Sequence, residues 1–150
     1  MYPKPPKSQV FRNLLQQCSQ LDIPLVEIRD LEKCLKETNI VVDALFGFGF
    51  KPPVREPFVQ ILDLLAKTSI PIASIDVPSG WDVDNGNPTG DSINPDLLIS
   101  LSVPKPCSTF FSGRYHYLGG RFIPKFLADE YNVEIPDYPG SDQCVLLPKL

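Results

Sequence analysis

Two aspartates, each at the end of a short apolar run, are the side chains of this sequence best placed to do chemistry. Asp76 follows the run 70–75 and precedes the turn residues 78–80, and Asp43 follows the run 40–42. Apolar runs bounded by turn residues are typical of buried strands. An acid at the carboxyl end of such a strand lies where open α/β sheets bind ligands. The two aspartates therefore form a candidate site, in which a carboxylate can give and take a proton.

Each of these polar residues also has a simpler interpretation. Asp76 could cap the turn that follows it, because aspartate favours turns, and Asp43 could hydrogen-bond a neighbouring loop. Ser79 suggests a hydrolase with His116 as its base, but Pro-Ser-Gly differs from the Gly-x-Ser-x-Gly sequence of a nucleophile elbow. His116 is therefore interpreted as a packed or surface histidine.

The composition favours one globular domain and excludes several other classes. The chain has 150 residues, of which 43% are hydrophobic and 21% charged, as in ordinary globular proteins. Its net charge of -4 does not favour nucleic acid as a partner. No apolar run approaches the roughly 20 residues that span a bilayer. The first residues lack the apolar segment of a signal peptide, so we expect a cytoplasmic or mitochondrial protein with no targeting segment in this chain.

The cysteines do not suggest a metal site. None forms a Cys-x-x-Cys pair and the chain has a single histidine, so a zinc site of the usual spacing is not indicated. Free thiols in a reducing compartment are the expected state. The four cysteines are Cys18, Cys34, Cys107 and Cys144.

The periodicity of apolar residues predicts alternating helices and strands. Helices are expected after an N-cap at Ser8, from about residue 31, over 56–67 and over 124–131. Strands are expected over 24–28, 39–45, 71–77, 97–102 and 117–123, with loops over 47–53 and 81–95 and an irregular tail after residue 131. Continuously apolar strands that alternate with helices predict an α/β fold, with a parallel sheet covered on both faces.

Four segments, in this order, resemble one known family. They are residues 41–48, 54–58, 72–81 and 113–122, and together they are similar to the NAD(P)H-hydrate epimerases, also called the YjeF N-terminal domain family or, in animals, apolipoprotein A-I-binding protein. The resemblance extends over most of the chain. It implies a Rossmann-like three-layer αβα sandwich with a mostly parallel sheet. Residues 1–150 are expected to form one such domain without the family's first strand and helix.

The resemblance implies a reaction and a set of site residues. The reaction is the epimerisation of the R and S forms of hydrated NADH or NADPH (NADHX or NADPHX), by inversion at the hydroxylated C6 of the reduced nicotinamide ring. Asp76 matches the substrate-contacting aspartate, and Asp43 and Ser79 match ligands of a bound potassium ion, a hard cation that prefers oxygen donors. The loop that lies along the ligand matches Gly47, Phe48, Gly49, Phe50, Lys51, Pro52 and Pro53.

The sequence also departs from the family pattern. The phosphate-binding Asn-Asn-Gly-Gly-Asp loop is not found in it, and Pro52 and Pro53 stand where some relatives have Gly and Asp. A non-catalytic Rossmann-like binding protein that has lost the phosphate loop is therefore an alternative function. Without its first strand the sheet would have an exposed edge, from which we expect reduced stability and association, with a homodimer and an apolipoprotein as candidate partners beside the small-molecule substrate.

Several further side chains have two interpretations each. Lys51 could pair with a ligand phosphate or be a solvated loop lysine, and Lys105, near the expected sheet rim, receives no catalytic role. Five phenylalanines could stack on a nicotinamide or adenine ring, although core and loop packing is the default for them. These are Phe46, Phe48, Phe50, Phe110 and Phe111.

Overall fold

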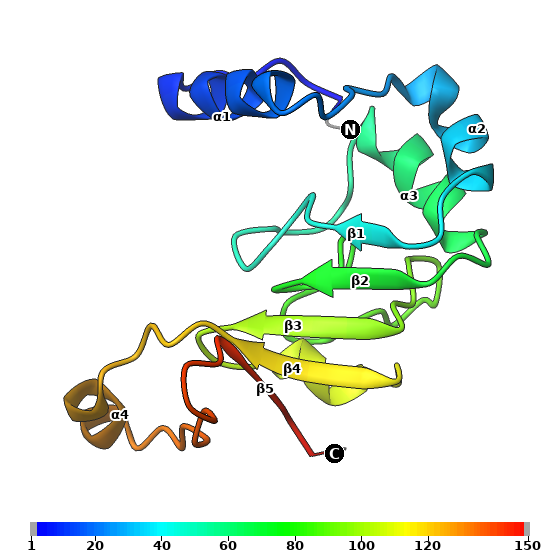
Figure 1. Ribbon diagram of the computed structural model, residues 1–150. Helices are drawn as coiled ribbons and strands as arrows, with labels where there is room; N and C mark the ends of the chain where they lie inside the picture. Colours follow the sequence, from blue (N-terminus) through cyan, green and yellow to red (C-terminus); the bar gives the residue numbers. More distant parts are fainter. Residues whose placement is uncertain (1–2, 149–150) are drawn as a thin grey trace.

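The computed structural model describes residues 3–148 and is built on a five-stranded sheet in the order β1-β2-β3-β4-β5 (Figure 1). The first four strands are parallel, and β5 is antiparallel to β4. Because β1, β2 and β3 are parallel, their carboxyl ends lie at one edge of the sheet. The strands are β1 (Val41–Asp43), β2 (Ile72–Ile75), β3 (Leu97–Leu101), β4 (Tyr115–Gly119) and β5 (Cys144–Leu146).

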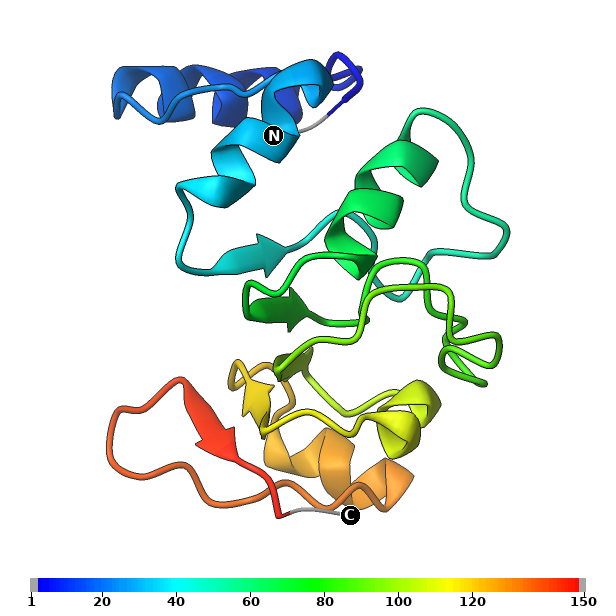
Figure 2. The same ribbon diagram turned by 90° about the vertical axis from the view of Figure 1, so that its right-hand side faces the viewer.

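Helix α3, between β1 and β2, contributes the largest group of buried residues to the core. Its buried residues, Phe58, Ile61, Leu62 and Leu65, recur at helical spacing and pack with Ile72 of β2. Figure 2 shows α3 and the short 3₁₀ helix η2 on the same face of the sheet. The helical elements are α1 (Gln9–Gln20), η1 (Ile28–Asp30), α2 (Leu31–Lys36), α3 (Phe58–Ala66), η2 (Pro106–Phe110) and α4 (Lys125–Tyr131).

A second buried cluster fixes the turn after β2 against η2. Val77, Trp81 and Cys107 form it. The Trp81 Nε1–H donates a hydrogen bond of 2.8 Å to the Ile93 carbonyl, and Ile93 itself has 0% exposure. This indole therefore ties the long loop 81–95 to the core.

The first helix is well formed but has no buried residue. The Phe11 N–H donates to the Ser8 hydroxyl at 3.3 Å, which confirms the predicted N-cap. The apolar residues of α1, such as Phe11 and Leu14, remain exposed, and α1 lies away from the sheet in Figure 1. Strand β1 pairs only with β2 among the described residues, and Val42 is exposed. The expected association through such an edge stays a prediction.

Most predicted elements are confirmed, with shifted ends, and two predictions are wrong. The strand predicted over 24–28 does not form: residues 24–27 have no regular structure and Ile28 begins η1, because no neighbouring strand among the described residues supplies hydrogen-bond partners. The tail after residue 131 is not wholly irregular: Tyr117 pairs with Leu146 in the β4–β5 ladder. The last predicted strand begins at Tyr115 and ends at Gly119, because Gly120 has a φ of 80° that strands do not adopt.

The predicted α/β fold is confirmed: a mostly parallel sheet with flanking helices, of Rossmann-like type. No helix among residues 3–148 is long and apolar enough to cross a membrane.

Candidate functional site

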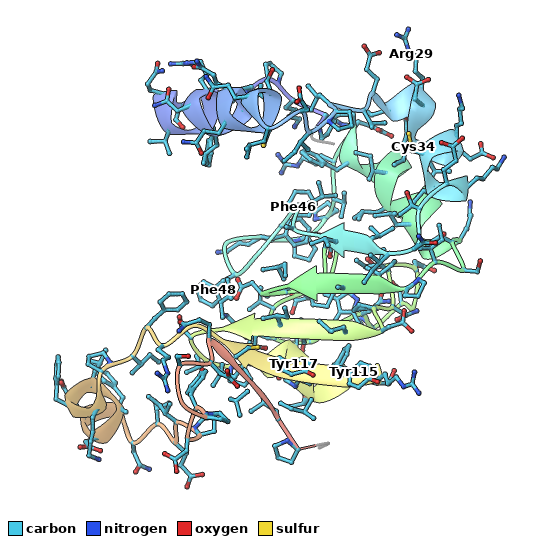
Figure 3. The ribbon with its side chains drawn as sticks, in the orientation of Figure 1. Arg29, Cys34, Phe46, Phe48, Tyr115 and Tyr117 are labelled. Atoms are coloured by element: carbon cyan, nitrogen blue, oxygen red, sulfur yellow. The ribbon has the colours of Figure 1, made fainter. Side chains whose placement is uncertain are left out.

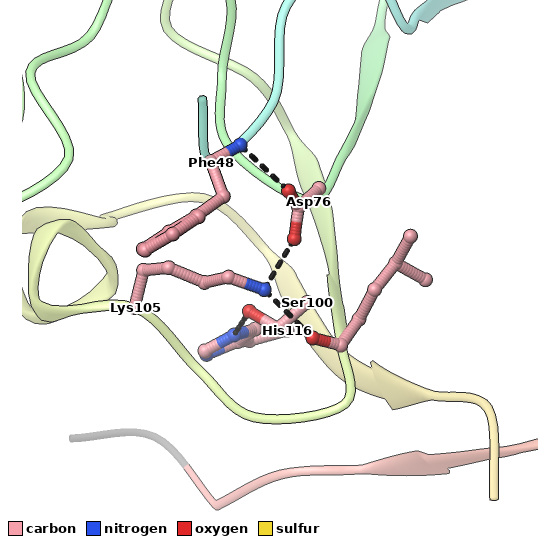
Figure 4. A network of polar contacts seen from close by, with 6 residues as sticks. Phe48, Asp76, Ser100, Lys105 and His116 are labelled. Atoms are coloured by element: carbon pink, nitrogen blue, oxygen red, sulfur yellow. Dashed lines mark hydrogen bonds and ion pairs between the residues drawn. The ribbon is translucent and has the colours of Figure 1, made fainter. Parts of the chain in front are cut away.

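Asp76 occupies the first position after β2 and faces the loop that precedes α3. Its N–H bonds to the Ile99 carbonyl at 2.7 Å, which continues the β2–β3 ladder, but its φ is 72°. Such left-handed backbone is uncommon for residues other than glycine, although aspartate adopts it more readily than most. Strained backbone of this kind clusters at functional sites. The Asp76 carboxylate oxygen Oδ2 accepts a hydrogen bond of 2.8 Å from the Phe48 N–H (Figure 4).

The contact between Asp76 and the loop depends on a glycine. A Cβ added at Gly47 would lie 2.9 Å from Oδ2 of Asp76, whereas one added at Gly49 would meet nothing within 4 Å. The small size of Gly47 therefore lets the loop reach the carboxylate. The sequence predicted that Asp76 and the loop 47–53 belong to one site, but it did not indicate the contact between Gly47 and the Asp76 carboxylate.

A lysine that the sequence did not assign completes the environment of Asp76. The ammonium of Lys105 pairs with Asp76 Oδ1 and also donates to the Leu101 carbonyl at 2.7 Å (Figure 4). The side chains of Lys105 and Asp76 are only 11% and 17% exposed. Asp76 comes directly after β2 and Lys105 four residues after β3. Their positions beyond the carboxyl ends of parallel strands were the signal that could have paired them.

Asp43 lies at the end of β1 and is buried, with 2% exposure. Its Oδ2 accepts hydrogen bonds of 2.8 Å from the Ser74 hydroxyl and from the Ser79 N–H. The Ser79 hydroxyl in turn accepts a bond of 3.0 Å from the Phe46 N–H. Asp43 therefore hydrogen-bonds the turn after β2, as its simpler interpretation expects, and this bond does not exclude a cation at its other oxygen.

Asp43 and Ser79 carry oxygen atoms, the kind of donor that a hard monovalent cation prefers. Oδ1 of Asp43 has only a long contact, 3.5 Å, from the Leu45 N–H, so its lone pairs are largely unused. No cationic side chain within residues 3–148 forms an ion pair with Asp43. A buried carboxylate without a counter-charge is costly. The nearby oxygen of Ser79 is a donor of the kind that hard cations prefer.

Ser79 and His116 do not form a catalytic pair. The His116 Nε2 is hydrogen-bonded to the Ser100 hydroxyl at 2.9 Å, and burial lowers the pKa of His116, which favours the neutral ring. Burial also raises the pKa of the Cys107 thiol to about 11, so this cysteine is protonated near neutral pH and is not activated as a nucleophile.

The predicted ligand loop divides into a packed part and an exposed part. Phe50 stacks on Phe46 with ring centroids 4.6 Å apart, and the ring centroids of Phe46 and Phe58 are 4.9 Å apart. The rings of Phe46 and Phe50 therefore pack within the protein, which was the default interpretation. Phe48 is 66% exposed and lies at the carboxyl ends of the strands in Figure 3. Lys51 and the two following prolines are exposed, and within residues 3–148 Asp76 forms its ion pair with Lys105 and not with Lys51. Phe110 is 57% exposed, and Phe111 packs with the Val77 cluster.

A cavity of about 450 Å³ adjoins this site on the side of Lys105. Its lining comes from the segment around η2, from β4 and from the end of β5. The residues that line it are Pro104, Lys105, Pro106, Ser108, Thr109, His116, Leu147 and Pro148.

Comparisons with known proteins agree with this architecture. The family model described as YjeF-related protein N-terminus matches residues 1–107. A crystal structure of the yeast protein ynu0 (YNL200c) superposes with a TM-score of 0.86 at 42% sequence identity. That match covers 97% of this chain and 64% of the yeast chain, so the present chain corresponds to somewhat less than two thirds of its neighbour. The chain belongs to the YjeF-related protein N-terminus family.

Proposed function

We propose that this chain epimerises the R and S forms of hydrated NADH or NADPH, and so takes part in the repair of damaged nicotinamide nucleotides. Membership of the YjeF N-terminal family is consistent with this activity. The observation that carries the proposal is the hydrogen bond from the Phe48 N–H to Asp76. It joins the residues that the resemblance names as substrate-contacting aspartate and ligand loop, although they are 28 positions apart in sequence.

The chemistry of the reaction requires such a group. Inversion at C6, which bears a hydroxyl and the ring nitrogen, requires a bond at this carbon to break and re-form. A positioned carboxylate that accepts and returns a proton accelerates such steps typically about 10²–10⁴-fold. Asp76 is held at the sheet edge, partly exposed to an incoming ligand, and its carboxylate accepts the Phe48 N–H.

We also assign the potassium ion of the resemblance to Asp43 and Ser79. Oδ1 of Asp43 and the Ser79 oxygens would hold it, and the ion would supply the positive charge that the buried carboxylate otherwise lacks. Because Ser79 also accepts the Phe46 N–H, a cation here would fix the start of the ligand loop. Its contribution is thus to position the loop that reaches Asp76.

The test is an assay that starts from one purified epimer of hydrated NADH and follows the other by chromatography, against a protein-free background. Asp76→Asn is expected to lower the rate about 10²–10⁴-fold. Asparagine tolerates the positive φ of this position, but its single side-chain oxygen can accept from Phe48 or from Lys105 and not from both, so far-UV circular dichroism verifies that the fold is retained. The matched control is Asp63→Asn, because Asp63 is exposed on α3.

Two outcomes would contradict the proposal. An unchanged rate in Asp76→Asn would remove Asp76 from the reaction. Binding of the hydrated nucleotide by the unsubstituted chain, without interconversion above background, would instead favour the non-catalytic binding protein.

A further inference from the structure

The Lys105–Asp76 ion pair is more buried than the other ion pairs of the described residues. Both side chains are largely covered, and the Lys105 ammonium has two oxygen partners, the Asp76 carboxylate and the Leu101 carbonyl. Removing two charges from water is expensive, and hydrophobic residues often stabilise a fold equally well. Stability is therefore a weak reason for this pair, and its place beside the ligand loop suggests a chemical one.

The two members of the pair carry complementary proton-transfer capacities. In an ion pair the carboxylate is the proton acceptor and the ammonium bears the proton. Both oxygens of Asp76 already accept hydrogen bonds, one from Lys105 and one from Phe48. Two of the three ammonium protons of Lys105 are directed at oxygens of the protein, which leaves one for a ligand. Lys105 also lines the cavity beside η2, although Asp76 and the ligand loop do not, so open space reaches this side chain.

From this geometry we propose that Lys105 is a second catalytic residue, the proton donor that works with Asp76 as acceptor; the assignment rests on the proposed epimerase function. Asp76 takes the proton of the C6 hydroxyl while the C6–N1 bond breaks. The electron pair of that bond goes to N1, which takes a proton from Lys105, and C6 becomes an aldehyde carbon. Rotation about C5–C6 and the reverse transfers close the ring on the other face. Both protons return to their donors, and nothing is oxidised or reduced.

A purely structural role for Lys105 and a role as proton donor predict different effects of substituting this lysine. A side chain that only holds Asp76 in place can be replaced by arginine, which also pairs with carboxylates. Arginine stays protonated in proteins, so it cannot take part in a proton transfer. The lysine–arginine exchange therefore separates holding the carboxylate from donating a proton.

The experiment measures kcat for epimerisation, and Kd for hydrated NADH by calorimetry, in the unsubstituted chain, Lys105→Arg and Lys105→Ala. Lys105→Arg should keep Kd within about threefold while kcat falls about 10²-fold or more. Ethylamine added to Lys105→Ala should restore part of the rate, increasingly with its concentration, because it replaces the missing donor. The control is Lys67→Ala, at the exposed end of α3, and far-UV circular dichroism verifies the fold of each variant.

Each other outcome overturns the assignment. A kcat for Lys105→Arg close to that of the unsubstituted chain would reduce Lys105 to a residue that holds Asp76. A weakened Kd with unchanged kcat would make it a binding residue only. An unsubstituted chain that does not exceed the background would overturn the proposed function and this inference together, whereas an active one with an active Lys105→Arg variant would overturn only the inference.

Discussion

Helix α1 and the sheet edge around Asp43 and Asp76 differ in the sequence separation of the residues whose hydrogen bonds stabilise them. Every side-chain hydrogen bond shown for α1 joins residues three to five positions apart. At the sheet edge two bonds are local, from Leu45 to Asp43 and from Lys105 to Leu101, but the other five join residues 28 to 36 positions apart. The first region is built by local interactions, and the second by contacts between strands and loops distant in sequence.

The difference shows what each kind of contact can achieve. A capping serine and a helical spacing of apolar residues are enough to form α1, yet they leave it without a buried residue. A site needs groups from several elements, so it forms only where the sheet has aligned the strand ends. Three predictions test this contrast, from the largest expected effect to the smallest.

Truncation of a buried and an exposed leucine compares the two regions directly. Leu98 of β3 has 0% exposure, whereas Leu14 of α1 is 48% exposed. Leu98→Ala should lower the free energy of unfolding by about 2–5 kcal/mol, through lost burial and a cavity. Leu14→Ala should change it by no more than about 0.5 kcal/mol. Urea unfolding measures both, and a loss above about 1.5 kcal/mol for Leu14→Ala would show that α1 is anchored to the sheet.

Two glycine substitutions compare a position that contacts Asp76 with one that does not, within the same loop. Gly47→Ala places a methyl group against the Asp76 carboxylate, whereas Gly49→Ala meets open space. Displacement of a catalytic group by about 1 Å can cost about 10²-fold in rate, so Gly47→Ala should lower epimerisation by about that factor. Gly49→Ala is the matched control and should keep the rate. Equal rates for the two variants would show that the Phe48–Asp76 contact does not matter for turnover.

Potassium should stabilise the sheet edge and not the helical region. The measurement is the difference between the free energies of unfolding in potassium chloride and in lithium chloride of equal ionic strength. Potassium at tenfold its Kd should add about 1.4 kcal/mol to the free energy of unfolding. Asp43→Asn should abolish that difference, and Asp22→Asn, an exposed change just after α1, should keep it. A potassium effect that survives Asp43→Asn would place the ion elsewhere.

The sequence predicted element types well where a single pattern extended over enough residues. The spacing of Phe58, Ile61, Leu62 and Leu65 predicted α3, and the apolar run before Asp76 predicted β2. The sequence-based prediction failed for strands whose formation depends on a neighbouring strand. Residues 24–27 have strand-like composition without a ladder, and β5 has only three residues, Cys144–Leu146. Strand formation requires a neighbour, which local sequence does not specify.

The candidate site divides in the same way. The sequence by itself determined that Asp43 and Asp76 end apolar strands and that a glycine loop lies between them, because turn residues and apolar runs are local signals. Only the tertiary structure decided that the loop reaches Asp76 through Phe48, and that Lys105 is the partner of Asp76. These contacts join chain segments 28 and 29 positions apart, and the parallel pairing of β1, β2 and β3 brings them together.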